Sequence, residues 1–412
     1  MNADADTSIV VDAAPVQTPA GEEAPVELSI VIPCLNEART LGACIEKAQR
    51  FLREYALAGE VVVADNGSTD GSQEIARGLQ VRVVHVRVKG YGSALMQGIA
   101  AARGTFIVMG DADDSYDFSQ LGPFLERLRA GDDLVVGNRF AGGIRRGAMP
   151  FLNRYLGNPA LTGVGRLFFG SRLGDFHCGL RAFSKAAAKR MDLQTTGMEF
   201  ASEMVVKATL LKLRISEVPT SLSPAGRDRP PHLRPWRDGW RHLRFMLIYS
   251  PRWLFLYPGL LLIWLGVLVG GWLLPGPRTL GHVTYDVQTL LYAAMSVLVG
   301  VQAVSFAVFT RIFAASEGLL PEEPRLKQFL RAQVLDAGLL IGVALMIIGF
   351  AGSVDALWIW SQHAFGPLDQ ANTLRLIIVA TTLLVLGCQL ALSSFFLGVL
   401  SLRRRGASGT AA

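Results

Sequence analysis

The chain has 412 residues, which is enough for two or three domains. Half of the residues are hydrophobic and the mean hydropathy is +0.33, which excludes a wholly soluble protein because the long apolar stretches gather after about residue 250. The formal net charge is +6, and a basic segment beside the apolar stretches favours an anionic membrane surface over nucleic acid as its partner. We therefore expect a soluble first half and a membrane-embedded second half.

Residues 1–26 are predicted to be a disordered acidic tail. The first 27 residues contain six acidic and no basic residues, and such a sequence buries too little apolar surface to fold. The chain also begins without the basic residues and apolar stretch of a secretory signal. The four cysteines include no CxxC pair and are predicted to be free thiols in a reducing compartment.

Strand and helix patterns alternate between residues 27 and 140. Apolar runs predict strands over 27–33, 59–65, 81–88, 105–111 and 133–140. Helical spacing of apolar residues predicts helices over 37–56, 71–79, 90–104 and 117–131. Because strands that alternate with helices form parallel sheets, we predict an α/β domain with a Rossmann-like, mostly parallel sheet over 27–225.

Polar or glycine-rich residues follow four of these strands, at 33–37, 65–68, 89–92 and 111–113. The carboxyl ends of parallel strands meet at one edge of a sheet, where ligands bind. The loop KGYGSAL, residues 89–95, resembles a phosphate-binding loop only loosely, so Lys89 is either a phosphate contact or a solvated charge. The sequence therefore predicts a ligand site along this edge.

The stretch GDADDSYD, residues 110–117, contains four aspartates. In an extended chain Asp111 and Asp113 point to the same side, where two carboxylates and substrate phosphates can bind Mg²⁺ or Mn²⁺. Such pairs are also common in solvated turns. Asp114 points the other way and is predicted to be solvated or to form the turn. Asp117 lies three residues before Gln120 and is predicted to cap the next helix.

The second half predicts an all-α membrane domain over 253–403. Four apolar stretches, at 254–274, 289–313, 336–360 and 374–402, are long enough to span a bilayer. The loop 314–335 and the tail from residue 403 carry three basic residues each, whereas loops 275–288 and 361–373 carry one and none. This bias places both termini, the tail 404–412 and the soluble half in the cytoplasm. The expected location is a bacterial inner (plasma) membrane.

Two segments of the soluble half are predicted to contact the membrane. The segment 226–252 contains seven Arg and two Asp, interleaved with Trp236 and Trp240, and suits an anionic membrane face. Residues 149–173 mix apolar side chains with Arg154, Arg166 and Arg172. They are predicted to lie in the interface and guide a lipid phosphate, with an ordinary helix on the sheet as the alternative.

Eight motifs in the soluble half resemble one enzyme family. They occur between residues 27 and 250 in the order IPCLNEA, DNGSTDGS, KGYGSAL, DADDSYD, GNRF, DFHCGLRAF, GMEFASEM and EVPTSLSPAGR. Together they resemble family 2 glycosyltransferases of the GT-A fold, and within that family the polyprenyl-phosphate glycosyltransferases. The resemblance implies transfer of a hexose from a nucleotide sugar of the UDP-glucose or GDP-mannose type to a membrane polyprenyl phosphate.

The resemblance also implies a donor site. Donor-binding residues would be Pro33, Asn36, Glu37, Asp65, Asp111 and Arg227, with Lys89 beside them. Asp65 would contact the base, and Arg227 would bind phosphate from a loop before the membrane. Asp111 and Asp113 would hold the Mg²⁺ or Mn²⁺. Ser115 stands where mannose synthases carry a third metal ligand, and a serine hydroxyl is a poorer one.

On the acceptor side, the resemblance implies that Arg139, Arg154 and Arg181 bind the phosphate, and it makes Asp175 and Arg139 the catalytic candidates. A phosphate monoester is mostly dianionic at pH 7 and needs little deprotonation. We therefore expect Asp175 to orient Arg181 or another cation rather than act as a base. A purely structural ion pair is the alternative for Asp175.

Two other functions remain open. A processive polysaccharide synthase of the same fold would carry a QxxRW motif before its channel helices, where this chain reads RPWRDGW. An inactive cytoplasmic domain on a lipid-flipping membrane protein is the second alternative, and the intact acidic and basic motifs speak against it. The four spans could also contact a flippase or a second copy of the chain.

Overall fold

The structure, a computed structural model, describes residues 11–12, 25–226, 235–316, 332–362, 364–366 and 370–401. The chain forms two compact units, and the boundary between them follows Tyr249. This boundary lies close to residue 253, the predicted start of the membrane domain. The first unit contains the predicted sheet, and the second contains long helices. The predicted segment 226–252 is described from residue 235 onward.

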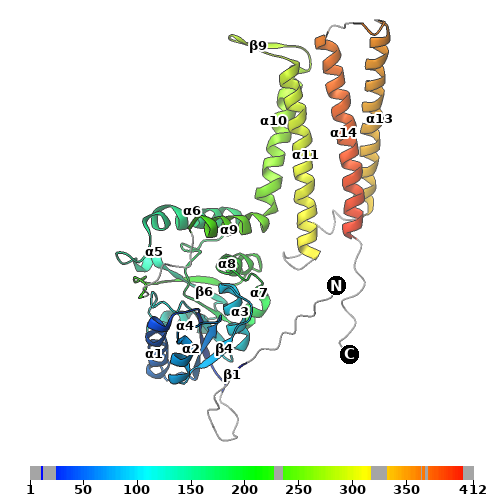
Figure 1. Ribbon diagram of the computed structural model, residues 1–412. Helices are drawn as coiled ribbons and strands as arrows, with labels where there is room; N and C mark the ends of the chain where they lie inside the picture. The colour runs from blue at the N-terminus through cyan, green and yellow to red at the C-terminus, as the bar shows by residue number, and fades with distance from the viewer. Residues whose placement is uncertain are drawn as a thin grey trace, which may run out of the picture. The chain divides into compact units, whose positions relative to one another are not determined.

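A mixed, mostly parallel sheet forms the centre of the first unit (Figure 1). Its order is β1-β4-β3-β2-β5-β7-β6-β8. The strands are β1 (Val11–Asp12), β2 (Leu28–Cys34), β3 (Gly59–Asp65), β4 (Arg82–His85), β5 (Phe106–Met109), β6 (Leu134–Asn138), β7 (Arg181–Ser184) and β8 (Ile215–Pro219). Strands β4, β3, β2 and β5 pair in parallel, so their carboxyl ends share one edge.

Helices cover this sheet because each buries one apolar face against it. Helix α1, for example, buries Leu41, Ile45 and Leu52 at helical spacing. The helices are α1 (Ala38–Glu54), α2 (Ser72–Gly78), α3 (Tyr91–Ala101), α4 (Gly122–Arg129), α5 (Arg139–Gly142), α6 (Asn158–Phe169), α7 (Lys185–Met191), α8 (Phe200–Leu210) and α9 (Pro235–Ile248), with a π-helical turn η1 (Asn153–Gly157). The five predicted strands and four predicted helices correspond to β2 to β6 and α1 to α4.

The structure corrects three expectations about this sheet. Strand β7 was missed, and it runs antiparallel between β5 and β6; its four residues RAFS are too short to show a pattern. Strand β8, parallel to β6, was also missed. Within the predicted disordered tail, Val11–Asp12 pairs antiparallel with β4, because the edge of β4 offers unpaired backbone groups.

The segment 149–173 forms η1 and α6, whose outward side is apolar. Phe151 is 77% exposed, and Tyr155 and Leu156 are each about 60% exposed, whereas Thr162 and Gly165 are buried. Helix α6 also packs against α9, and Trp236 and Trp240 of α9 are exposed. The first unit thus carries an exposed apolar and aromatic surface on η1, α6 and α9.

In the part of the second unit that the structure describes, four helices are long and apolar enough to cross a membrane, over Arg252–Leu273, Val287–Ala315, Asp336–Gln362 and Asn372–Leu400. They comprise η2 (Arg252–Leu256) with α10 (Tyr257–Leu273), then α11 (Val287–Ser316), α13 (Ala332–Gln362) and α14 (Gln370–Ser401). A short hairpin, β9 (Arg278–Leu280) and β10 (Val283–Tyr285), joins α10 to α11. Helices α13 and α14 run side by side (Figure 1).

The predicted fold class is confirmed by these two units: an α/β domain with a mostly parallel sheet, followed by four candidate spans. The helical unit includes an ion pair between Asp286 and Arg375, which joins the beginnings of α11 and α14. All four cysteines are free, as predicted. Three of them are buried in the first unit, where burial raises the pKa of Cys34 to about 11.

Candidate active site

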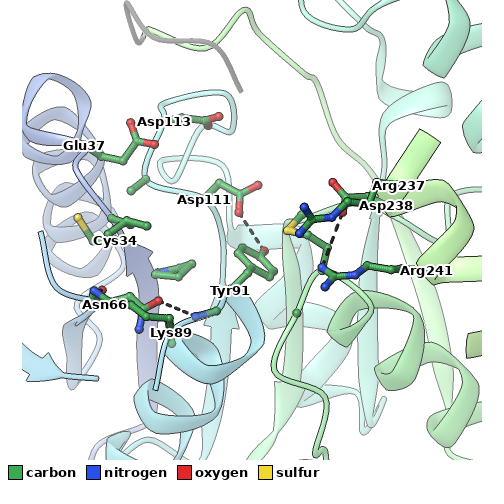
Figure 2. Close-up of a pocket in the computed structure, with 17 residues that line it drawn as sticks. Cys34, Glu37, Asn66, Lys89, Tyr91, Asp111, Asp113, Arg237, Asp238 and Arg241 are labelled. Carbon is green, nitrogen blue, oxygen red and sulfur yellow. Dashed lines mark hydrogen bonds and ion pairs between the residues drawn. The ribbon is translucent and has the colours of Figure 1, made fainter. Parts of the chain in front are cut away.

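A cavity of about 440 Å³ opens at the carboxyl ends of β2, β3 and β5, within the first unit (Figure 2). Its walls come from the loops after these strands, from the start of α3, from residues 197–198 and from α9. Four carboxylates and three cationic side chains line it: Glu37, Asp111, Asp113, Asp238, Lys89, Arg237 and Arg241. The predicted sheet-edge site is therefore a real cavity, with α9 as an additional wall.

Asp111 and Asp113 both line this cavity. The Oδ1 atom of Asp111 accepts a hydrogen bond of 2.9 Å from the hydroxyl of Tyr91. Burial, and then the Asp111 carboxylate, raise the pKa of Tyr91 well above its usual value, so this hydroxyl stays a donor. Asp113 is 8% exposed, and its Oδ1 accepts from the backbone N–H of Ser115 at 3.1 Å.

This acidic pair fits a hard divalent cation that also binds substrate phosphates, because each carboxylate is turned to the cavity and keeps acceptor capacity. The described residues hold no group of three His, Cys, Asp or Glu side chains that could bind a metal. Phosphate oxygens would therefore have to complete the coordination. Ser115 offers no carboxylate, in keeping with the departure from the mannose-synthase pattern.

Gly179 allows the backbone to approach Asp111. A Cβ atom at this position would lie 2.5 Å from Asp111 Oδ2 and 3.1 Å from the ring of Tyr116. Gly179→Ala is therefore expected to displace the Asp111 carboxylate and lower the activity by at least about tenfold, since catalytic groups misplaced by an ångström lose large factors. Initial rates of the sugar transfer that the resemblance implies measure this.

Gly78→Ala provides the control for that variant, because a Cβ at Gly78 would meet nothing within 4 Å. Equal activity in Gly179→Ala, Gly78→Ala and the unchanged protein would show that the position of Asp111 does not matter.

The loop after β3 is held by Asp65 and Asn36. Asp65 is buried, and its carboxylate accepts from the backbone N–H groups of Gly67 and Ser68 and from the Gln73 amide at 2.6 Å. Asn36 has a positive φ of 57°, and its Oδ1 accepts from the backbone N–H of Thr69 at 2.8 Å. Neither residue is among those that line the cavity, so both shape its loops; a contact of Asp65 with a base stays a prediction.

Pro33, Glu37 and Lys89 do line the cavity. The Nζ atom of Lys89 donates to the backbone carbonyl of Asn66 at 2.6 Å, which ties the loop after β4 to the loop after β3. Asn66 continues this link, because its Oδ1 accepts from the N–H of Gly90 at 2.7 Å. Sequence reasoning missed Asn66 and Tyr91, although both lie inside the quoted motifs.

Helix α9 brings Arg237, Asp238 and Arg241 to the cavity. Arg241 Nη1 lies 4.0 Å from Asp238 Oδ1, and Asp238 is 5% exposed. The basic and aromatic residues of this segment predicted contact with a membrane surface, but not that three of its residues line the cavity. The spacing of Arg237 and Arg241, four residues apart, was the available signal that both lie on one helix face.

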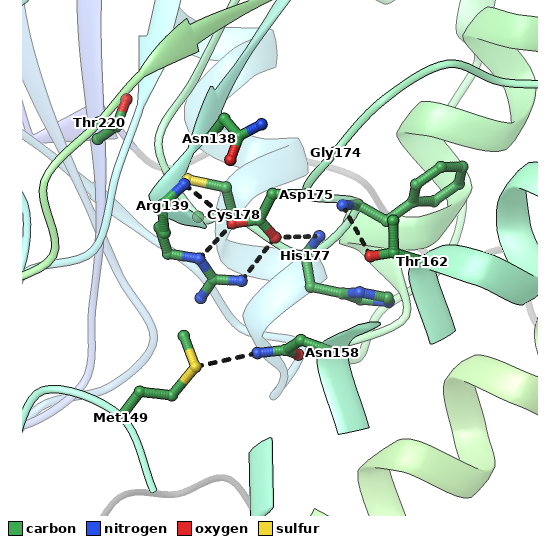
Figure 3. Close-up of polar contacts among 12 residues, drawn as sticks. Asn138, Arg139, Met149, Asn158, Thr162, Gly174, Asp175, His177, Cys178 and Thr220 are labelled. Atoms are coloured by element: carbon green, nitrogen blue, oxygen red, sulfur yellow. Dashed lines mark hydrogen bonds and ion pairs between the residues drawn. The ribbon is translucent and has the colours of Figure 1, made fainter. Parts of the chain in front are cut away.

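Arg139 and Asp175 form a buried, two-pronged ion pair (Figure 3). Arg139 Nε and Nη2 donate to the two Asp175 oxygens at 2.6 and 2.8 Å. Burial alone would lower the pKa of Arg139, but Tyr116 and Asp175 raise it above its ordinary value. Asp175 thus pairs with Arg139 and not with Arg181; that it orients a catalytic cation stays a prediction beside the alternative of a structural ion pair. Glu217 in turn accepts from the backbone N–H groups of Gly174 and Asp175.

The other predicted arginines lie elsewhere. Arg181 is fully buried and donates to the backbone carbonyls of Phe176, Cys178 and Ala201. Arg181 therefore does not make the predicted contact with the acceptor phosphate, because its guanidinium is inaccessible. Arg154 on η1 lies 5.4 Å from the ring of Tyr155 and is not among the cavity residues. Arg227 lies outside the described residues.

Comparison with known proteins identifies the family. Residues 29–192 match Glycosyl transferase family 2, and residues 308–401 match the Glycosyltransferase family 2 C-terminal transmembrane region. The low-salt glycan biosynthesis hexosyltransferase Agl6 of Haloferax volcanii is 36% identical over 386 residues, which cover 90% of this chain and 89% of that protein. The chain belongs to glycosyltransferase family 2.

Two further similarities accompany this assignment. The dolichyl-phosphate hexose transferase of Haloferax volcanii is 30% identical over 194 residues, or 47% of this chain and 81% of that protein. The crystal structure of glucosyl-3-phosphoglycerate synthase from Mycobacterium tuberculosis with Mn²⁺, UDP and glucosyl-3-phosphoglycerate has a TM-score of 0.43 and 22% identity; the match covers 55% of this chain and 80% of that chain.

The family 2 match ends at residue 192, so α8, β8 and α9 of this glycosyltransferase lie beyond it. Helix α9 is nevertheless bound to the domain. His242 Nδ1 lies 2.8 Å from the hydroxyl of Ser202 on α8, and that hydroxyl lies 3.3 Å from His177 Nε2. The rings of His177 and His242 are 4.7 Å apart, edge to face. A buried polar cluster therefore fixes α9 to the loop that carries Asp175.

This cluster makes the stability of the glycosyltransferase depend on pH. Burial lowers the pKa of His242 to about 4, and burial with the neighbouring His242 lowers that of His177 well below its usual value. The unfolded chain therefore binds more protons below pH 6.5, so stability is expected to fall from about pH 6.5 to pH 4. Thermal unfolding at pH 7.5 and pH 5 measures the slope, and His242→Asn should flatten it.

The exposed His282 supplies the matched control, since His282→Asn should leave that slope as it is. A slope that survives unchanged in His242→Asn would exclude the cluster as its origin.

The other two aspartates of GDADDSYD, Asp114 and Asp117, have different local roles. Asp114 adopts a positive φ of 59° and pairs with Lys47 at 2.7 Å. It therefore forms the turn, which is one of the two alternatives predicted for it. Asp117 Oδ1 accepts from the backbone N–H and the hydroxyl of Ser119. The prediction that Asp117 caps the next helix is wrong, because α4 begins at Gly122 and its cap residue is Leu121.

Proposed function

We propose that this glycosyltransferase moves a hexose from a nucleotide sugar, of the UDP-glucose or GDP-mannose type, to the phosphate of a membrane polyprenyl phosphate. The names of two relatives support the class of reaction: one is a hexosyltransferase and the other a dolichyl-phosphate hexose transferase. The family match to a transmembrane region and the four candidate spans support an acceptor that resides in the membrane.

The observation that carries the proposal is the division of charge in one cavity. Figure 2 draws Glu37 and Asp113 on one side, and on the other Arg237 and Arg241, whose two positive charges exceed the single negative charge of Asp238 beside them. A reaction between two phosphate-bearing substrates needs such a site, because the anions repel each other unless positive charge stands beside both. A cavity for a neutral sugar acceptor would not need the second group of cations.

On the donor side, Asp111 and Asp113 would hold Mg²⁺ or Mn²⁺ together with the donor diphosphate. A bound divalent cation would neutralise the charge that develops on the departing diphosphate. The Tyr91 hydroxyl fixes Asp111 for this task, and Lys89 stands at the same wall. Pro33 and Glu37 would lie beside the nucleoside.

On the acceptor side, an oxygen of the phosphate monoester would attack the anomeric carbon. The bond from that carbon to the donor diphosphate breaks, and the nucleoside diphosphate leaves with the electron pair, so the configuration inverts. No proton has to move, because the monoester is mostly dianionic at pH 7. Asp175 therefore needs no role as a base, and its carboxylate pairs with Arg139.

The exposed apolar surface on η1, α6 and α9 supports access from a membrane. Phe151, Tyr155 and Trp236 are 61–81% exposed, which is costly in water and favourable in a lipid interface. We propose that this surface rests on the cytoplasmic face of the plasma membrane and admits the lipid phosphate. The distribution of basic residues in the loops supports the same orientation.

Purified full-length protein in detergent tests the proposal with radiolabelled UDP-glucose or GDP-mannose, a short polyprenyl phosphate and Mg²⁺ or Mn²⁺. The expected product is a singly glycosylated lipid phosphate, formed with one donor and lost when EDTA removes the metal. A long polymer would instead indicate a processive synthase. No turnover with a panel of donors would favour an inactive domain on a lipid-handling membrane protein.

A further inference from the structure

One side of helix α9 packs against the domain, and another side lines the cavity. His242, Phe245 and Met246 are buried and attach α9 to the domain, the last two against Val206 of α8. Because the polar link from His242 to Ser202 and this apolar contact act together, α9 is held firmly on α8. Its neighbouring side, which carries Arg237 and Arg241, is exposed to the cavity.

Among the described residues, few cationic side chains are placed to bind the acceptor phosphate. Arg139 uses both prongs of its guanidinium on Asp175, and Arg181 is fully buried against backbone carbonyls. Lys89, at the opposite loop, donates to the carbonyl of Asn66. Apart from Lys89, the cationic side chains that line the cavity in the described part of the chain are those of Arg237 and Arg241.

We propose that Arg237 and Arg241 form the binding site of the acceptor phosphate. This inference rests on the proposed function and adds residues to it that lie outside the matched family region. Two guanidinium groups on consecutive turns of one helix can each donate paired hydrogen bonds to a phosphate. Asp238, between them in sequence and 4.0 Å from Arg241, limits the positions that the Arg241 side chain adopts.

The position of the two arginines also fits the direction from which the acceptor phosphate would attack the donor. The two arginines stand across the cavity from Glu37 and Asp113 (Figure 2). A phosphate monoester bound to them would face a donor whose diphosphate lies at the acidic side. The donor diphosphate has the same chemistry and is the other possible occupant of the arginine site, so the experiment has to distinguish the two.

The test compares Arg237→Gln, Arg241→Gln and the double variant in full-length protein, with Arg244→Gln as control. Arg244 lies on the same helix and is exposed, but it is not among the cavity residues. Each single variant is expected to raise the KM for polyprenyl phosphate by about tenfold, as for the loss of a charged hydrogen bond, and to leave the KM for the nucleotide sugar within about twofold. Arg244→Gln should change neither constant by more than about twofold.

Two outcomes would overturn the inference. If the unchanged enzyme transfers sugar but the double variant keeps its acceptor KM, the arginine site is wrong while the proposed function stands. If the donor KM rises and the acceptor KM does not, the site binds the donor diphosphate, which also overturns the inference. Arg237→Lys and Arg241→Lys keep the charge and should recover part of the acceptor affinity; thermal unfolding of all variants excludes a general loss of structure.

Discussion

Asp113→Asn is expected to reduce sugar transfer by about a thousandfold, because it removes one of the two charges that would hold the metal against the donor diphosphate. The amide has the same shape as the carboxylate and can still accept from the backbone N–H of Ser115. The loss should therefore come from charge and not from misfolding. Initial rates over a titration of Mg²⁺ measure it, and the variant should also need more metal for half-maximal rate.

Asp114→Asn is the control for this experiment. Asp114 is the next residue, but its carboxylate pairs with Lys47 and its side chain is 29% exposed. Asparagine also tolerates the positive φ at this position, so the variant should keep transfer within about twofold of the unchanged enzyme and lose at most about 1 kcal/mol of stability. Equal losses of transfer in both variants at unchanged stability would contradict the separate roles of these aspartates.

Asp175→Ala is expected to lower the free energy of unfolding by about 3–5 kcal/mol, because it leaves the Arg139 guanidinium buried without its counter-charge. The side chain of Asp175 is fully buried and that of Arg139 is 10% exposed. Chemical denaturation of the enzyme in detergent, followed by a signal from the sheet domain, measures the change. Replacing both partners with apolar residues, as in Arg139→Met with Asp175→Leu, should recover only part of it, because the backbone N–H groups of Arg139 and His177 lose their acceptor.

The pair of Arg129 and Glu27 provides a control with matching geometry and different burial. Arg129 Nε and Nη2 donate to the two Glu27 oxygens at 2.7 and 2.9 Å, but the side chains are 50% and 31% exposed. Glu27→Ala is expected to cost no more than about 1 kcal/mol. A similar cost for Glu27→Ala and Asp175→Ala would mean that burial does not set the strength of these pairs.

The local pattern of the chain predicted much of the cavity wall formed by the loops after β2 to β5. Apolar runs placed β2 to β6 within a few residues, and the polar residues after β2, β4 and β5 do line one cavity. Asp111 and Asp113 were singled out on the premise of an extended chain, whereas β5 ends at Met109 and residues 112–113 form a turn; both aspartates nevertheless line the cavity. Asp117 was misjudged because a turn intervenes before α4 and shifts the helix start to Gly122, which no spacing rule reveals.

The partner of Asp175 was harder to predict because its contacts join distant parts of the chain. Arg139 and Asp175 are 36 positions apart, and the sequence offered Arg181 as an equal partner for Asp175. Strand β7 decided between them, since it runs between β5 and β6 and buries Arg181 against backbone carbonyls. The basic segment of α9 was assigned to the membrane alone, because charge and aromatic content do not show which side of a helix meets a cavity.

By itself, the sequence determined the α/β class, the four candidate spans and the acidic residues after β5, because each depends on residues close together in the chain. Only the tertiary structure decided that Arg139 is the partner of Asp175, that Tyr91 and Gly179 position Asp111, and that α9 closes the cavity. The physical reason is that burial and pairing depend on which distant segments pack together. A local pattern of side chains contains no information on that choice when several arginines compete for the same carboxylate.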